Sequence, residues 1–469
     1  MQPSYEQLLI ENELLKGLIA RMDDHIKKLE SRNKELEGRI ADLEAQINQN
    51  SKNSSKAPSS DRKKNSSPLK DKKNRSYHPG ANRQLLPKEA VTSKETRLTE
   101  TCPRCSSTMN PTDKVVSWQQ IELPVIKPLI HQIDLVTSKC SCCRLEIQPK
   151  LTDGEQFLLG PRLEAFVNLL MGQYRQGHRP VRTMIATILP GVLLSQGLIS
   201  KIKARTAKAL SEPYEELLGK VVSSERPVHA DATGWRYKGI NEQALVLRMD
   251  NIITYALVPR QNGETLAGLI GKKIHCLVSD RGLATSQIVI KIKQYCLAHL
   301  IRNIKGQAEH PGASIEDNQQ LGVVYDTLQE LFIDKHRFER GEIGKSTWKQ
   351  YGYAKWSVIK ECLEGLMVSG STKKLRKFCS KLLGQIEYFR AYLKDETIPM
   401  TNNPAEEALR NLVIARKLCF GSRSIYGKRW RETLHSCLET LGRHGKSMLD
   451  FLAGAIQAAR TGQPIPSVL

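Results

Sequence analysis

One β-rich stretch constrains the fold of this 469-residue chain most strongly, because it is the only long section with strand character. Short runs of aliphatic and β-branched residues predict three consecutive strands, over residues 228–231, 243–249 and 252–258. Asp250 and Asn251 favour a tight turn, so the last two strands should form a hairpin. Gly234 is expected to turn the backbone just after the first strand.

The order of elements after this stretch predicts the topology of the sheet. We expect a short helix over 264–270, a fourth strand over 274–279 and a second helix over 286–295. Three hairpin-linked strands followed by an alternating helix and strand are typical of an RNase H-like mixed sheet. Residues 301–398 are basic and helical in pattern, and we expect a helical insertion there. The predicted fold class is multidomain α+β, with the core divided between residues 223–300 and 399–469.

Three acidic side chains stand where this topology would bring them together. Asp231 ends the first predicted strand, Asp280 ends the fourth, and Glu406 lies in a later helix. Each has a structural alternative, as a strand-end cap, a helix start or a capping-box carboxylate. Together they predict a phosphoryl-transfer site in which two ions, Mg²⁺ or Mn²⁺, lie about 3.5–4 Å apart. Asp231 would bridge both ions, and the other two acids would each hold one.

Helical phase distinguishes Glu406 from its neighbour Glu407. With Asn403 as the N-cap and Pro404 at the first helical position, Glu406 lies about 60° from Leu409, beside the apolar side of the helix. Glu407 lies about 160° from Leu409 and should face solvent. We therefore expect Glu406 to be the third acid of the site.

The first 48 residues carry a seven-residue apolar repeat. Its leucine-like positions are Leu8, Leu15, Met22, Leu29, Leu36 and Leu43, and four residues after each come Asn12, Ile19, Ile26, Asn33, Ile40 and Ile47. Six uninterrupted heptads predict a parallel two-stranded coiled coil whose asparagines set the register. The alternative is one amphipathic helix folded onto the rest of the chain. We expect residues 1–48 to pair two copies of the chain.

Two Cys-x-x-Cys pairs predict a structural zinc site in a ribbon-like module over residues 96–150. The pairs are Cys102 with Cys105 and Cys140 with Cys143, separated by 34 residues. Thiolates at this spacing can each supply half of a tetrahedral zinc site. Cys142 is an alternative fourth ligand.

Residues 151–222 are helical in pattern and contain a candidate helix-turn-helix. A helix over 183–189, a break at Pro190 and Gly191, and a second helix capped by Ser195 would dock in the major groove of DNA. Any pair of packed helices gives a similar pattern. The residues expected to face DNA are Gln196, Ser200, Lys201 and Lys203.

Basic residues near the predicted acids should grip the DNA backbone. His299 and Arg302 are expected to orient a phosphate or a water molecule, with a satisfied core histidine as the alternative for His299. After Glu406 come Arg410, Arg416, Lys417, Arg423, Lys428, Arg429 and Arg431. Trp430, between them, is expected to stack on an unpaired base.

Composition also points to nucleic acid. The formal net charge is +22 at pH 7, which favours a polyanionic partner, although it could simply solubilise an ordinary enzyme. Residues 49–95 are rich in Ser, Asn and Lys, and should form a flexible basic linker. We find neither a signal peptide nor a long apolar run, so we expect a cytoplasmic protein without a membrane anchor.

The order of these motifs resembles the DDE transposases of bacterial insertion sequences, specifically the insertion-sequence-sixty-six family. The similarity rests on the heptad coil with Asn53-Ser-Ser-Lys-Ala-Pro-Ser-Ser-Asp61, the paired Cys-x-x-Cys, His229-Ala-Asp-Ala-Thr-Gly-Trp-Arg236, Cys296-Leu-Ala-His299 and Asn402-Asn-Pro-Ala-Glu-Glu-Ala-Leu-Arg410. It implies that Asp231, Asp280 and Glu406 form the family's acidic triad in an RNase H-like core. Departures at Ala232, Arg281 and Thr401 remove no acid.

The resemblance implies a nucleoid-associated bacterial transposase that cleaves the ends of its element and joins the 3′ hydroxyl to target DNA. Its expected partners are the terminal inverted repeats, target DNA, a second copy of the chain and accessory proteins of the element. One alternative function is a catalytically inactive DNA-binding regulator derived from the same fold. Another is a structure-selective nuclease, which would cut without joining strands.

Overall fold

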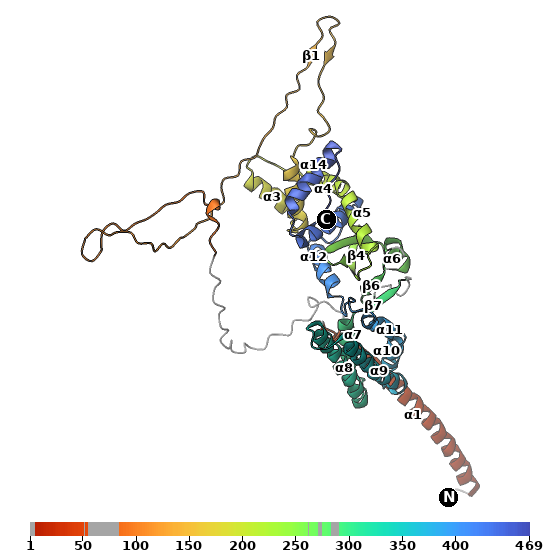
Figure 1. The fold of residues 1–469 in the computed structure, drawn as a ribbon. Coiled ribbons are helices and arrows are strands. Elements are labelled where there is room, and N and C mark those ends of the chain that lie inside the picture. The colour runs from red at the N-terminus through yellow and green to blue at the C-terminus, as the bar shows by residue number, and fades with distance from the viewer. Residues whose placement is uncertain (1–4, 51, 55–83, 261, 271–273, 283–289) are drawn as a thin grey trace. The chain divides into compact units, whose positions relative to one another are not determined.

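The computed structural model describes residues 5–50, 52–54, 84–260, 262–270, 274–282 and 290–469 (Figure 1). Its contacts divide the chain into two compact units. The larger unit contains residues 1–62, 134–187 and 191–469, and the smaller contains residues 63–133 and 188–190. The larger unit holds the sheet that carries two of the predicted acids.

Five strands form one mixed sheet in the larger unit. They are β3 (Val228–Tyr237), β4 (Ile240–Met249), β5 (Ile252–Val258), β6 (Cys276–Ser279) and β7 (Ile292–Tyr295). The order across the sheet is β5-β4-β3-β6-β7. β4 runs antiparallel to β3 and β5, whereas β6 runs parallel to β3 and β7. The predicted mixed sheet with three hairpin-linked strands is therefore confirmed.

The first strand does not turn where the sequence indicated. The prediction for Gly234 is wrong, because Gly234 lies inside β3 and pairs with Gln243 of β4. The turn lies at Lys238 and Gly239, with φ of 50° and 86°, the left-handed conformations that a two-residue hairpin loop needs. Asp231 is thus a mid-strand residue, although the parallel pairing of β3 with β6 ends just before it.

The helix predicted over 286–295 is wrong for its last residues. Residues 292–295 form β7, which pairs with β6 from Ile292 opposite Cys276 to Tyr295 opposite Ser279. Residues 286–289 of the predicted helix lie outside the described residues. A segment with Ile and Tyr suits the open edge of β6, and the hydrogen bonds of the sheet outweigh a weak local helix preference.

Different helices cover the two faces of the sheet. On one face, Ala230, Leu245 and Leu277 pack with residues of α5 (Ser211–Val222) and α6 (Gly263–Ile270). On the other face, Trp235, Val246 and Tyr255 pack with α12 (Asn403–Cys419). Because side chains alternate along a strand, Asp231 lies on the same face as Trp235, the face that α12 covers.

Helix α13 (Ile425–Arg443) closes the outer edge of the sheet at β5. Side-chain oxygens of the helix accept hydrogen bonds from backbone N–H groups of β5: Thr440 from Ile253 at 3.1 Å, Ser436 from Tyr255 at 2.9 Å and Glu432 from Leu257 at 2.7 Å. Positions four apart on a helix share one face, which matches alternate N–H groups of a strand edge. The edge is therefore satisfied without another strand.

A helical layer precedes the sheet in sequence and packs with the last helices of the chain. It contains α2 (Pro161–Gly172), α3 (His178–Ile188) and α4 (Gln196–Ala209), and its core also includes residues of α13 and α14 (Met448–Thr461). Ser195 caps α4 as predicted, since its hydroxyl accepts a hydrogen bond from Leu198 N at 3.0 Å. DNA binding by α3 and α4 stays a prediction.

Residues 297–393, between the second and third acids, form a helical group with its own core. Its elements are α7 (Leu297–Ala308), α8 (Ile315–Glu339), α9 (Lys345–Ser369), α10 (Lys373–Leu383), α11 (Ile386–Phe389) and the 3₁₀ helix η4 (Ala391–Leu393). Trp348, Trp356 and Phe389 are fully buried among them. The core of this group includes Cys276, Val278 and Tyr295 of the sheet, which fixes α7 against β6 and β7.

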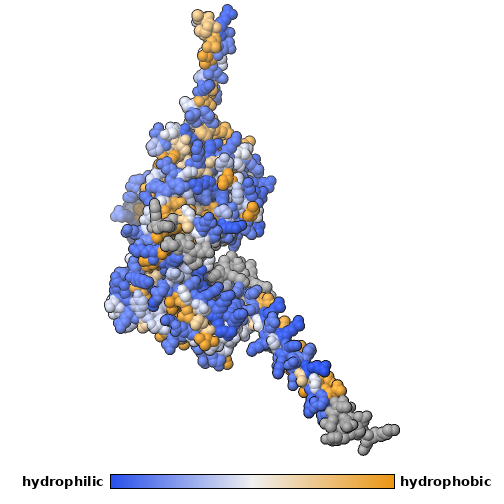
Figure 2. Space-filling view, turned by 90° about the vertical axis from the view of Figure 1, so that its right-hand side faces the viewer, coloured by the Kyte–Doolittle hydropathy of each residue, from blue (hydrophilic) through white to orange (hydrophobic). Residues whose placement is uncertain are grey.

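The N-terminal helix α1 (Tyr5–Ile47) leaves its apolar positions on the surface (Figure 2). Leu29 and Ile40, from the two sets of heptad positions, are 54% and 55% exposed. Such a stripe matches the surface that a second helix would cover in a coiled coil. None of the described helices is both long and apolar enough to cross a membrane.

The end of α1 contacts the helical group around α7. Asp42 Oδ1 lies 3.1 Å from His310 Nε2 and 3.1 Å from Lys374 Nζ. Asn53 donates a hydrogen bond to Glu309 Oε2 at 2.5 Å. The carbonyl of Asn53 sits so close to Gly306 of α7 that a Cβ there would overlap it. Glycine at this position therefore permits the contact.

Candidate active site

The register between β3 and β6 places two of the predicted acids side by side. Ala230 pairs with Ser279 in the last residue pair of the parallel ladder. Asp231 and Asp280 follow directly after this pair, so they lie at the same level on the neighbouring segments that continue β3 and β6. Neighbouring strands lie about 4.7–4.9 Å apart. Asp231 Oδ1 accepts a hydrogen bond from the backbone N of Ala232 at 2.7 Å, which fixes its carboxylate near the strand.

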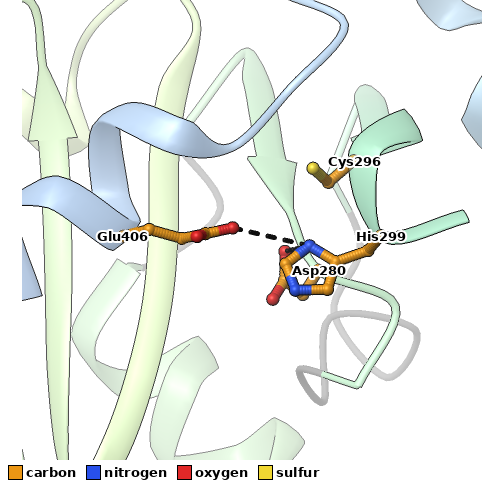
Figure 3. A group of neighbouring side chains, drawn as sticks. All are labelled: Asp280, Cys296, His299 and Glu406. Atoms are coloured by element: carbon orange, nitrogen blue, oxygen red, sulfur yellow. Dashed lines mark ion pairs between the residues drawn. The ribbon is translucent and has the colours of Figure 1, made fainter. Parts of the chain in front are cut away.

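Helix α12 brings the third acid to the same place. Glu406 Oε1 lies 3.6 Å from His299 Nδ1, which in turn lies 2.9 Å from Asp280 Oδ1. Figure 3 shows these side chains pointing toward one another with Cys296 beside them. One ligand atom from each of the four residues lies within 4.8 Å of those of the others. Glu407 is exposed instead and pairs with arginines, as its helical phase predicts.

A buried asparagine that the sequence analysis left without a role fixes the start of α12. Asn402, rather than Asn403, is the N-cap residue, and its side chain makes no capping hydrogen bond. Its Nδ2 donates to the carbonyl of Ala230 at 2.9 Å, and its Oδ1 lies 3.1 Å from His229 Nδ1. Its backbone N donates to Cys296 Sγ at 3.2 Å. Asn402 thereby holds α12 against the strand of Asp231 and the first turn of α7.

The clustered oxygens fit a divalent cation. Asp280 Oδ1 is buried, lies 2.9 Å from His299 Nδ1, and belongs to the group of four possible ligand atoms. Burial and then the negative charge of Asp280 raise the pKa of Asp231 to about 7. A cation among the carboxylates would offset both effects. Carboxylate oxygens are the ligands that Mg²⁺ and Mn²⁺ prefer.

His299 and Arg302, on the first turns of α7, lie beside the acids, and Asp280 and Arg302 act in opposite directions on the charge of His299. Burial lowers the pKa of His299, but Asp280 and Cys296 together raise it to about 10. Arg302 Nη2 lies 2.8 Å from His299 Nε2 and 3.5 Å from Glu406 Oε1. The Arg302 contact favours a neutral ring, since an imidazolium would turn a second N–H toward the guanidinium. Both residues lie within reach of the acids, as the sequence led us to expect.

Trp430 and Lys203 are not the exposed DNA contacts that the sequence predicted. Trp430 cannot stack on an unpaired base, because it is 1% exposed and its Nε1 donates to Asn168 Oδ1 at 2.7 Å. Lys203 was expected to face outward, yet its ammonium lies 4.3 Å over the Trp430 ring. Burial lowers the pKa of Lys203 to about 8. Both residues belong to the interface between α4 and α13, where an amphipathic side chain can cover a large ring.

The other predicted DNA contacts differ in exposure. Exposed ones are Gln196, Ser200, Lys201, Arg410, Lys417 and Arg423. Lys428 and Arg429 form ion pairs with Glu242 at 2.5 Å and Glu215 at 2.7 Å, while Arg431 is buried, so its predicted exposure is wrong. Arg416 donates to Thr233 Oγ1 at 3.1 Å and to the carbonyl of Gly234. Direct contact with DNA stays a prediction for the exposed residues.

Each Cys-x-x-Cys pair forms the same kind of turn. Ser106 N donates to the carbonyl of Cys102 at 2.9 Å, and Arg144 N donates to that of Cys140 at 3.0 Å. Ser106 and Arg144 have left-handed φ of 60° and 62°. The matching turns make Cys143, rather than Cys142, the counterpart of Cys105. Backbone N–H groups, that of Cys143 first, lower the pKa of Cys140, which favours the thiolate that zinc binds.

Comparison with known proteins assigns the family. Residues 159–429 match the Transposase IS66 family, and residues 1–86 match a family of unknown function, DUF6444. No curated protein matches the chain. Because the first match covers more than half of the sequence and includes all three acids, the chain belongs to the Transposase IS66 family. The resemblance found in the sequence is thereby confirmed, and the protein's general role is that of a transposase.

Proposed function

We propose that this protein is a DDE transposase with an RNase H-like core, which cleaves the ends of its element and joins the 3′ hydroxyl to target DNA. The observation that carries the proposal is the approach of Glu406 to Asp280 across His299, although α7 through α11 separate the two acids in sequence. The sheet order, with three antiparallel strands followed by two parallel ones, also supports the RNase H-like assignment.

The chain's own residues would orient the reacting groups. Asp231, Asp280 and Glu406 would hold two divalent cations, which supply charge neutralisation at the attacking and leaving oxygens. Arg302, with its guanidinium 3.5 Å from Glu406, can bind a phosphate oxygen at the rim of this carboxylate cluster. His299 is 8% exposed, so we assign it to holding Asp280 and Glu406 in place rather than to contact with DNA.

The partners follow from the same assignment. The net charge of +22 supports binding to DNA, through the ends of the element and the target. The exposed heptad stripe of α1 supports a homodimer. The paired Cys-x-x-Cys turns support a structural zinc ion held by Cys102, Cys105, Cys140 and Cys143.

The decisive experiment uses matched glutamates. Cleavage of DNA carrying the element's ends is measured with Mg²⁺ or Mn²⁺ for the wild type, Asp231→Asn, Glu406→Gln and Glu407→Gln. Loss of charge at either proposed ligand should lower the rate about 100-fold or more, while Glu407→Gln should cleave normally. Wild-type activity in Asp231→Asn or Glu406→Gln would overturn the assignment. Cleavage without strand joining would instead identify a nuclease.

A further inference from the structure

A groove lies along β3 beyond the carboxylate cluster. Its volume is about 540 Å³, and β3, β4 and the C-terminal end of α12 form its walls. The residues that matter most are Gly234, Arg236, Gln243, Arg416, Lys417 and Phe420. Gly234 lies three residues after Asp231, which is about 10 Å along an extended strand. The groove therefore begins about 10 Å along β3 from Asp231.

Phe420 adopts a conformation that a large side chain rarely accepts. It follows the last residue of α12 with φ of 57° and ψ of 17°, the left-handed region where glycine is usual. Its side chain is 77% exposed, so packing does not explain the choice of an aromatic residue. Strain of this kind at an exposed site points to a role outside the folded core.

The loop that presents Phe420 is fixed to β3. Ser422 N donates to the carbonyl of Arg236 at 2.8 Å, and Lys238 N donates to the carbonyl of Ser422 at 2.9 Å. Gly421, with φ of 110°, lies so close to the Arg236 carbonyl that a Cβ would overlap it. Trp235 Nε1 adds a hydrogen bond to Ser422 Oγ at 3.3 Å. The aromatic ring therefore stands on a rigid support.

The charges around the groove favour a nucleic acid. Arg236 and Lys417 are exposed, and Glu242, the one acid that lines the groove among the described residues, is neutralised by Lys428 at 2.5 Å. Asn241 and Gln243 add amide groups that can donate to and accept from the edge of a base. An exposed aromatic ring among cations is the arrangement on which unpaired bases stack.

From this arrangement we propose that the groove holds an unpaired nucleobase of the DNA strand that leaves the active site, stacked on Phe420 and flanked by Arg236 and Lys417. The proposal rests on the proposed function for the presence of DNA at the acids. In this proposal Phe420 takes the base-stacking role that the sequence had suggested for Trp430, which is buried. A nucleobase is the occupant favoured over an apolar peptide, because cations and amides surround the ring.

The test compares two probes on the full-length protein without added divalent cation. One is a short single-stranded oligothymidylate, and the other is an abasic oligonucleotide of the same length. Fluorescence anisotropy gives a Kd for each. Base stacking should make the wild type prefer the first probe about tenfold. Phe420→Ala should bring this preference close to one while leaving abasic binding unchanged, and Phe420→Trp should retain it.

Two variants control for folding and for position. Phe420→Gly should raise the thermal unfolding midpoint, because glycine relieves the left-handed strain, yet it should lose the preference for bases. Tyr426→Ala removes another exposed aromatic side chain, one outside the groove, and this variant should retain the wild-type preference for the oligothymidylate. An unchanged preference in Phe420→Ala, or an equal loss in Tyr426→Ala, would overturn the proposal. Because no cleavage is measured, a failed catalytic assignment in Asp231→Asn would leave this result independent.

Discussion

At the scale of single residues, the site depends on groups that do no chemistry. Asn402 is fully buried and satisfies Ala230 and His229 on β3 while its backbone bonds Cys296. The paired asparagines were visible in the sequence, but nothing there indicated which of them turns inward. The packing of α12 on the sheet determines this, because the Asn402 side chain contacts the carbonyl of Ala230, next to Asp231, whereas the Asn403 side chain faces solvent.

Replacing this amide should therefore damage stability and activity together. Asn402→Ala leaves a buried carbonyl and a buried imidazole without partners, which should cost about 1–3 kcal/mol of unfolding free energy. Cleavage should fall as well, since Glu406 is anchored through the same residue. Thermal unfolding and the cleavage assay check both effects. Asn403→Ala, at the exposed neighbour, is the matched control, and equal effects of the two changes would contradict this role for Asn402.

A second buried residue should make stability depend on pH. Burial, followed by the nearby charges of Arg431, Arg175 and Lys203, holds the pKa of His435 well below its ordinary value of 6.5. His435 Nε2 lies 2.7 Å from Arg431 Nη1, so the native ring is neutral and accepts that hydrogen bond. The unfolded chain binds a proton below pH 6.5 and the folded chain does not. The stabilisation that the fold gains from the neutral His435 ring is thus complete above pH 6.5 and is lost as the pH falls below it.

The expected loss is about 1.4 kcal/mol for each pH unit below about 6.5. Unfolding measured between about pH 5 and pH 7 should show this slope in the wild type and a shallower one in His435→Gln, whose amide oxygen can still accept from Arg431. His336→Gln, at an exposed position, should keep the wild-type slope. Identical slopes in the wild type and His435→Gln would show that His435 is not the titrating group.

At the scale of elements, the two cysteine turns make a choice that spacing alone left open. The turn after Cys140 repeats the hydrogen bonds of the turn after Cys102, and from this repetition we expect Cys143, rather than Cys142, to be the fourth zinc ligand. Cys143→Ser should therefore lower the amount of bound zinc and destabilise the turns, whereas Cys142→Ser should still bind about one zinc ion per chain. Zinc content measured on purified protein distinguishes them. Loss of zinc from the Cys142 variant alone would reverse the assignment.

At the scale of the whole molecule, we expect the heptads of α1 to determine how many copies act together. We expect a dimer by light scattering, because Leu29 and its equivalents expose an apolar stripe. Leu29→Lys places a charge in the predicted seam and should yield a monomer at low concentration. Ser31→Lys, two residues on and facing away from that seam, should stay dimeric. A monomeric wild type would contradict the coiled coil.

Much of this arrangement was accessible from the sequence because short-range rules governed it. Helical phase separated Glu406 from Glu407, and apolar runs located the strands that carry Asp231 and Asp280. The failures arose where distant residues decide. β7 forms because β6 offers an open edge, and Gly234 continues its strand because β4 pairs with it. Trp430 is buried by α2 and α4, which no local pattern around residue 430 indicates.

The length of β3 has one more consequence. A single extended strand carries Asp231 and then, about 10 Å further on, Gly234, which lines the groove. No loop or hinge lies between them, so this interval is set by covalent geometry and cannot adjust to the substrate. With a base held in the groove, the strand would fix the distance along the DNA between that base and the phosphate at the acids. Ends of the wrong spacing would then be rejected by length before their sequence matters.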